Sequence, residues 1–258
     1  MFRALLLALF VSACGGSGGG SSSASPGPLP SGTAQVQLLF MGNSHTSVND
    51  VPGMVAALVK AGRPDKTVEA VTAPSWMSLE DRAHDAASLA LLRSRSWKFV
   101  VLQAQDYSSS GLFLYPIDGA VSLVGEARKV GAVPILFPEW PRLGINETQR
   151  IYDLHLSIAR EAPACVPPIP QAFDLSLARN PDIVLHAADG NHSAPAGAFL
   201  AALVIATTMT GVAPDTLPAI TGFEIDTGTQ ARLRAVAAET VLAYSPRMGC
   251  PSDPVGVP

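Results

Sequence analysis

The chain has 258 residues, of which 48% are hydrophobic and 15% are charged, and its formal net charge is -4. This composition permits one sizeable buried core, and the acidic balance excludes the basic electrostatic footprint of a nucleic-acid-binding protein. No apolar run after the N-terminus has the length of a membrane span, so we expect any membrane attachment to come from the first residues.

The first residues have the pattern of an export signal. One positive charge at Arg3 precedes a short apolar stretch over 4–11, which is too short to cross a bilayer. The stretch runs into Val11-Ser12-Ala13-Cys14, which resembles the lipobox of bacterial lipoproteins and predicts cleavage before Cys14 and lipid on its sulfur. The alternative is ordinary secretion with cleavage near Ala13, which would leave Cys14 as an incidental thiol. Either reading predicts an exported protein, and the first predicts one anchored to a bacterial membrane in the cell envelope.

The segment that follows is almost entirely Gly, Ser, Pro and Ala up to Gly32. Such a segment cannot bury apolar surface, so it predicts a disordered tether with a span on the order of 20–25 Å. The expected organisation is therefore a signal peptide over 1–13, a tether over 14–34, one catalytic domain over 35–245 and a C-terminal tail over 246–258.

Short apolar runs alternate with helical patterns along the rest of the chain. Asn49 and Asp50 offer helix caps, Ser78-Leu79-Glu80-Asp81 is a capping-box pattern, Gly131 is a natural residue after a helix, and Ser193 can cap the penultimate helix. The expected strands are 36–41, 68–71, 97–102, 133–137 and, at an edge because of its prolines, 165–169. The expected helices are 51–61, 78–92, 119–130, 146–161, 195–210 and 227–243. This alternation predicts an α/β fold of three layers, α/β/α, with a mostly parallel central sheet.

In such a sheet, ligands bind beyond the carboxyl ends of the strands. The first strand runs into Gly42-Asn43-Ser44-His45-Thr46, and the third ends in Gln103-Ala104-Gln105-Asp106. Late in the chain, Asp189-Gly190-Asn191-His192 precedes the helix expected at 195–210. We expect these polar residues to gather at one edge of the sheet.

These blocks carry a resemblance to a known superfamily. Gly42-Asn43-Ser44 resembles the nucleophile block of SGNH/GDSL hydrolases in its Gly-Asn-Ser variant, and Asp189 with His192 matches their late Asp-x-x-His block. The resemblance continues through Gly197 and Leu200 and covers the chain from Gln35 to about Gly211. It implies the flavodoxin-like SGNH fold, ester hydrolysis or related acyl transfer, and neither a metal nor an organic cofactor.

The resemblance assigns three catalytic roles. A serine hydroxyl is a poor nucleophile until a base removes its proton, so Ser44 would attack the substrate while His192 accepts the proton. Asp189 would orient the imidazole and stabilise its charged form. Each residue also has a structural interpretation: Ser44 as a turn residue, His192 as a hydrogen-bonded residue at a helix start, and Asp189 as a turn former.

The expected oxyanion hole departs from the superfamily pattern. The main-chain N–H of Ser44 is one candidate donor, and Gln105 stands where the family has Asn. The block after the second strand falls in Ser75-Trp76-Met77-Ser78 without a glycine, which makes Ser78 the candidate for the remaining donor.

Other residues leave two interpretations open. Cys165 and Cys250 form either a disulfide, worth about 3–5 kcal/mol, or two buried thiols. His45 is interpreted as structural. The histidines outside the blocks do not have the spacing of metal ligands; they are His84, His155 and His186. Four aromatic residues in predicted loops either shape a substrate pocket or pack in the core: Trp76, Tyr107, Tyr115 and Trp140.

The sequence therefore predicts an ester hydrolase of the esterase or deacetylase type. Its expected substrate is a small-molecule or carbohydrate ester of the envelope or extracellular space. One alternative is a binding lipoprotein on the same scaffold, whose weakened oxyanion blocks have lost catalysis. Another is a structural envelope lipoprotein, against which the polar residues at the predicted strand ends argue.

Overall fold

The computed structural model describes residues 33–254 and 256–257. Its centre is a parallel sheet of four strands in the order β2-β1-β3-β4. The strands are β1 (Val36–Met41), β2 (Val68–Thr72), β3 (Phe99–Leu102) and β4 (Val133–Leu136). Because all four run in the same direction, the segments that follow them gather at one edge of the sheet.

Helices make up much of the remaining described chain. In order along the sequence they are α1 (Ser44–Ser47), α2 (Val51–Gly62), α3 (Leu79–His84), α4 (Ala86–Arg93), α5 (Asp118–Lys129), α6 (Thr148–Glu161), α7 (Ile169–Arg179), α8 (Pro195–Thr210) and α9 (Thr227–Ala243). Two short 3-10 turns cover Val48–Asp50 and Pro214–Thr216.

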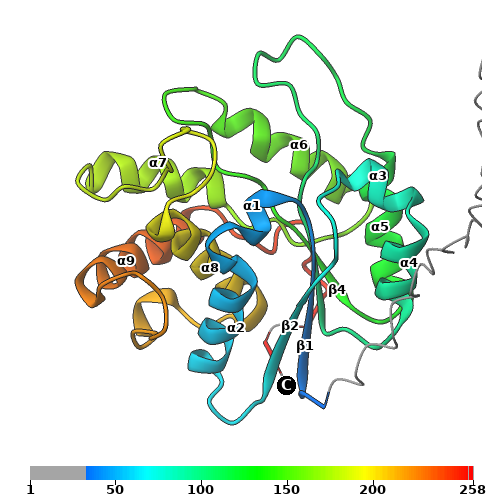
Figure 1. The fold of residues 1–258 in the computed structure, drawn as a ribbon, viewed down its shortest axis with the longest axis horizontal. Helices are drawn as coiled ribbons and strands as arrows, with labels where there is room; N and C mark the ends of the chain where they lie inside the picture. Colours follow the sequence, from blue (N-terminus) through cyan, green and yellow to red (C-terminus); the bar gives the residue numbers. More distant parts are fainter. Residues whose placement is uncertain (1–32, 255, 258) are drawn as a thin grey trace, which may run out of the picture. The chain divides into compact units, whose positions relative to one another are not determined.

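Alternation along the strands assigns their side chains to two cores. In β1, Leu38 and Phe40 pack with α2, α7, α8 and α9, whereas Leu39 and Met41 pack with α3, α4, α5 and α6. Figure 1 shows α2, α8 and α9 on one side of the strands and α3, α4 and α5 on the other. The sheet is therefore buried on both faces, which explains the near-continuous apolar runs of its strands. The predicted fold class is confirmed.

The structure corrects three predicted elements. The helix predicted over 78–92 is two helices, since Asp85 is extended and its side chain caps α4 by accepting from the N–H of Ser88. Cys165 makes a single bridge to β4 instead of starting a fifth strand, and the unpredicted helix α7 follows at Ile169. Ser193 does not cap α8, because Ala194 occupies the cap position and the Ser193 hydroxyl has no partner in the described chain.

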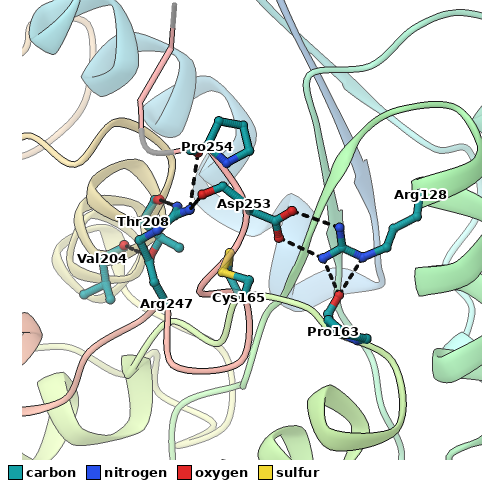
Figure 2. The surroundings of a disulfide bond; sticks show 9 residues. Arg128, Pro163, Cys165, Val204, Thr208, Arg247, Asp253 and Pro254 are labelled. Atoms are coloured by element: carbon teal, nitrogen blue, oxygen red, sulfur yellow. Dashed lines mark hydrogen bonds and ion pairs between the residues drawn. A yellow bond between two sulfur atoms is a disulfide. The ribbon is translucent and has the colours of Figure 1, made fainter.

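The C-terminal segment is fastened to the domain. Cys165 and Cys250 form a disulfide, which decides between the two readings of these cysteines (Figure 2). Beside it, the Arg128 guanidinium donates to both carboxylate oxygens of Asp253 at 2.9 and 2.7 Å. Arg247 donates to the carbonyl oxygens of Asp253 and Thr208, so the segment after α9 is tied to α5 and α8.

Some sequence predictions fall outside the described residues. Cys14, the signal over 1–13 and the tether up to Gly32 belong to them. Within the described ranges, no helix combines the length and the apolar character that a membrane crossing needs.

Candidate active site

Ser44 stands in a tight turn at the carboxyl end of β1. The strand ends at Met41, and Ser44 is the first residue of α1, so its hydroxyl emerges at the edge where the strands end. The Asn43 side chain caps the helix by accepting from the N–H of His45 at 3.0 Å. Gly42 is required here, because a β-carbon at this position would overlap the Thr46 hydroxyl and the Gln103 side-chain oxygen.

His192 lies on a loop that organises itself. Asp189 Oδ1 accepts from the main-chain N–H groups of Asn191 and His192, both at 2.9 Å, and Gly190 adopts a positive φ of 69°. The other oxygen, Oδ2, lies 2.6 Å from His192 Nδ1. The hydrogen bond from His192, followed by those from the main chain, lowers the pKa of Asp189 to about 2. Asp189 is therefore a carboxylate at neutral pH.

The two segments meet although 148 positions separate them in the sequence. His192 Nε2 lies 2.9 Å from Ser44 Oγ, within the range for proton transfer. An ionised Asp189 can only accept a hydrogen bond, so the proton of a neutral His192 lies on Nδ1, facing Asp189. His192 Nε2 is then free to accept from the Ser44 hydroxyl. The structure thus brings the three residues of the predicted triad into one hydrogen-bonded chain.

Gln103, which the sequence singled out only as the start of a block, supports the Ser44 turn. Its side-chain oxygen accepts from the Asn43 N–H and from the Thr46 hydroxyl, both at 2.8 Å. Its amide nitrogen donates to Glu139 Oε1. Gln103 and Thr46 are almost completely buried, so these hydrogen bonds are shielded from water and fix the turn from beneath.

Arg82 supports the same turn from another side. It is a fully buried arginine on α3, and its Nη2 donates to the carbonyl oxygens of Gly42 and Ser75, both at 2.6 Å. Its Nη1 donates to Ser88 Oγ at 3.0 Å. Burial lowers the pKa of Arg82, with a smaller opposing effect of Asp85. One side chain thus joins the nucleophile turn to the loop after β2, a link that nothing in the sequence pattern indicated.

Three hydrogen bonds attach the His192 loop to its surroundings. The Trp140 indole donates to the carbonyl of Asn191 at 2.8 Å, and the Asn49 side chain donates to the carbonyl of Ser193 at 2.7 Å. The Leu143 N–H donates to the carbonyl of Gly190 at 2.9 Å. Loops from β1 and β4 therefore determine where the imidazole stands.

The oxyanion expectations have mixed outcomes. The Gln105 amide nitrogen donates to the carbonyl oxygens of Asp106 and Pro116, both at 3.0 Å, which uses both of its hydrogens. Gln105 therefore has no donor left for an oxyanion in this conformation, and that expectation is corrected. The Ser78 hydroxyl caps α3 by accepting from the Asp81 N–H. The main-chain N–H groups of Ser44 and Ser78 make no hydrogen bond to the described residues, so both stay candidate donors.

His45 lies closer to the triad than its sequence interpretation implied. Its ring stacks on that of His192, with centroids 5.0 Å apart and planes inclined by 23°. It also contacts Trp140 and lies 3.9 Å from the Glu139 carboxylate. The other histidines have structural contacts: His84 with Glu80, His155 with the carbonyl of Ile151, and His186 with that of Pro141.

A cavity of about 330 Å³ adjoins the Ser44 turn. Trp76 and Tyr107 line it, as two of the four predicted aromatics, whereas Trp140 is buried in packing and Tyr115 lies partly exposed on the loop before α5. The rest of its wall is largely polar, including Asn43, Asp81, Gln105, Asp106, Glu139 and Arg142. Burial of the Asp106 side chain raises its pKa, and the negative charges of Asp81 and Glu80 raise it further.

The fold and site define an α/β protein with a parallel sheet and a Ser–His–Asp chain at its carboxyl edge. The sequence matches no protein-family model and no curated protein. Among solved structures, the chain is similar to a protein from Slackia heliotrinireducens that is provisionally assigned as an SGNH hydrolase. That likeness has 26% identity and a TM-score of 0.54 over 67% of this chain and 98% of that one.

A second solved structure supports the fold alone. It is a protein of the DUF4886 family from Bacteroides uniformis, with 17% identity and a TM-score of 0.58 over 81% of this chain and 95% of that one. The Slackia heliotrinireducens protein is thus the neighbour whose SGNH assignment agrees with the resemblance of the sequence blocks.

Proposed function

We propose that this protein is a serine hydrolase that cleaves ester bonds with Ser44 as nucleophile, His192 as general base and Asp189 as its orienting carboxylate. The observation that carries the proposal is the unbroken chain from Ser44 through His192 to Asp189. His192 Nε2 lies 2.9 Å from Ser44 Oγ, and His192 Nδ1 lies 2.6 Å from Asp189 Oδ2. A binding protein on this scaffold has no need of an imidazole held between a carboxylate and a serine hydroxyl. The neighbouring SGNH-type structure supports the same reading.

The chemistry follows from these contacts. Ser44 Oγ attacks the ester carbonyl as its proton passes to His192 Nε2, and the imidazolium is stabilised by Asp189. The carbonyl oxygen gains negative charge, which the free N–H groups of Ser44 and Ser78 would stabilise. His192 then protonates the leaving alcohol, and water repeats the sequence to release the acid.

The lining of the cavity beside Ser44 favours one class of ester substrate. Its lining carries hydrogen-bonding groups on several sides, with Trp76 exposed at its rim. Such a wall suits an ester of a hydroxyl-bearing compound better than a long acyl chain. We therefore include carbohydrate esters, with removal of a small acyl group, in the proposal.

The test is covalent labelling with a fluorophosphonate probe, followed by mapping of the modified residue by mass spectrometry. We expect a single adduct on Ser44 and hydrolysis of a small activated aryl acetate. The Ser44→Ala variant should show neither, whereas the control Ser109→Ala, on the loop before α5, should show both. An unlabelled wild-type protein without hydrolysis would contradict the proposal.

Attachment to a membrane through lipid on Cys14 belongs to the proposal as well. It is supported by the Val11-Ser12-Ala13-Cys14 pattern in the sequence. Mass spectrometry of the mature N-terminus should find a lipidated cysteine, and Cys14→Ser should release the protein or leave it unprocessed. A soluble wild-type chain without lipid that starts elsewhere would contradict this part.

A further inference from the structure

Glu139, which sequence reasoning did not single out, contacts Gln103 beneath the Ser44 turn and His45 beside His192. It follows β4, and its side chain is mostly buried, with 14% exposed. Within the described chain its carboxylate has two close polar contacts, one with Gln103 and one with His45. These two neighbours lead to different catalytic residues.

The first contact fixes the orientation of the Gln103 amide. A carboxylate can only accept, so Glu139 Oε1 holds the amide nitrogen of Gln103 toward itself. The amide oxygen is thereby turned to the nucleophile turn, where it accepts from the Asn43 N–H and the Thr46 hydroxyl. If the amide were reversed, two N–H groups would face each other at Asn43. The Glu139 carboxylate thus selects the orientation of the Gln103 amide that supports the Ser44 turn.

The second contact leads to the base. Glu139 Oε2 lies 3.9 Å from His45 Nε2, and the His45 ring stacks on the His192 ring. When His192 takes the Ser44 proton, positive charge develops within this stack. The charged and titratable groups in contact with the stack are Asp189, 2.6 Å from His192 Nδ1, the His45 ring itself, and Glu139, 3.9 Å from His45.

We propose that Glu139 is a positioning residue that acts on both Ser44 and His192. It orients the Gln103 amide that holds the Ser44 turn, and its charge favours the protonated form of His192. This inference rests on the proposed serine-hydrolase function. No proton moves to Glu139: the Ser44 O–H bond breaks, and the proton goes to His192 Nε2. Its effect is on the geometry and the charge that this transfer requires.

The two effects can be separated by substitution. Glu139→Gln has nearly the same shape and can still accept from Gln103, but it has no charge. Glu139→Ala loses both. The readouts are the rate of fluorophosphonate labelling of Ser44 between pH 5 and 9, and kcat and KM for a small aryl acetate. Glu161→Gln, an exposed glutamate at the end of α6, is the matched control and should behave as the wild type.

For Glu139→Gln we expect the acid limb of the labelling rate to move down by about half a pH unit, because a lost negative charge makes protonation of the imidazole less favourable. The plateau rate should fall only a few-fold. For Glu139→Ala the plateau should fall about ten- to a hundredfold with KM little changed, since a small misplacement of a reacting group has an effect of that size.

An acid limb unchanged in Glu139→Gln, together with a wild-type plateau in Glu139→Ala, would overturn the inference. If Glu139→Ala fails to fold, as circular dichroism would report, the acid limb of the isosteric Glu139→Gln decides alone. A wild-type protein that does not react with the probe would instead contradict the proposed function, so the two failures are distinguishable.

Discussion

The turn that carries Ser44 is largely buried and held by side chains from distant segments, whereas the loop that carries His192 is partly exposed and combines its own hydrogen bonds with three from its surroundings. Around Ser44, hydrogen bonds arrive from Gln103 after β3 and from Arg82 on α3. Around His192, Asp189 supplies both the loop-forming hydrogen bonds and the partner of the imidazole, although half of its side chain is exposed.

The two segments differ in how far the local sequence determines their structure. An Asp-x-x-His loop is a local device, since one carboxylate accepts from the main chain at two following residues and from the imidazole. The nucleophile turn has Asn43 as its local cap, but its support comes from residues 40 to 60 positions away along the chain. We therefore expect substitutions in the loop to change chemistry with little effect on folding. Substitutions around the turn should change both.

The largest effect is expected where the two segments meet. Ser44→Ala and His192→Ala should each lower kcat/KM for an activated aryl acetate by about 10⁴-fold or more. The double variant should be scarcely worse, because both residues serve one proton-transfer step. Circular dichroism should show all three variants folded. Independent, additive losses would mean that the contact between Ser44 and His192 is not the catalytic one.

Asp189→Asn tests the loop alone. The asparagine oxygen can still accept from the main chain, but its amide group can stabilise the wrong imidazole tautomer, so we expect a loss of about 10²- to 10⁴-fold with the fold intact. Asp65→Asn, on the surface after α2, is the control.

The pKa of Asp189, about 2, also makes a pH prediction. This depressed pKa means that the carboxylate is present above about pH 4 and is lost only as the pH falls toward 2. Protonation of Asp189 should therefore add no step to the pH–activity profile of the wild type between pH 7 and 5. A step in that range that disappears in Asp189→Asn would contradict this assignment.

Arg82→Met tests the external support of the turn. The substitution leaves the buried carbonyl oxygen of Gly42 without its donor, at about 1–3 kcal/mol, and removes the hydrogen bond to the partly buried carbonyl of Ser75 and the packing of the arginine side chain. We expect the free energy of unfolding to fall by about 3 kcal/mol and the labelling rate of Ser44 to fall about tenfold or more. Arg93→Met, an exposed arginine on α4 paired with Glu126, should change stability by less than about 1 kcal/mol. Equal effects in the two variants would remove the special role of Arg82.

The smallest effect on catalysis is expected for Gln105→Ala. Its amide is committed to two carbonyl oxygens of the loop before α5, so the substitution should loosen that loop and lower kcat less than about tenfold. Removal of a true oxyanion donor would lower it about 10²- to 10³-fold. A loss of that larger size, measured with the same aryl acetate, would restore Gln105 to the oxyanion hole.

Patterns local in the sequence determined much of this protein. The apolar runs of the strands predicted β1 to β4 to within two residues, because strands covered on both faces are mostly apolar, although the edge strand β2 is only partly buried. Asp50 predicted the start of α2, since its side chain accepts from the Gly53 N–H three residues on. The Asp189–His192 pattern contained the internal hydrogen bonds of the acid–base loop for the same reason: they span two or three residues. The hydrogen bonds that attach this loop to Trp140, Asn49 and Leu143 come from outside the pattern.

Tertiary structure alone decided the rest. Asp85 divided a continuous helical pattern, since it caps a second helix where the chain turns, and the prolines near Ile169 began a helix instead of an edge strand. The Gln105 side chain turned to the loop, while Gln103, two positions earlier, took the place beneath Ser44, because a side chain's partners depend on which groups the fold brings within 3 Å. Gln103, Glu139 and Arg82 stand in three separate segments, and no pattern along one segment could indicate that they meet at the nucleophile turn.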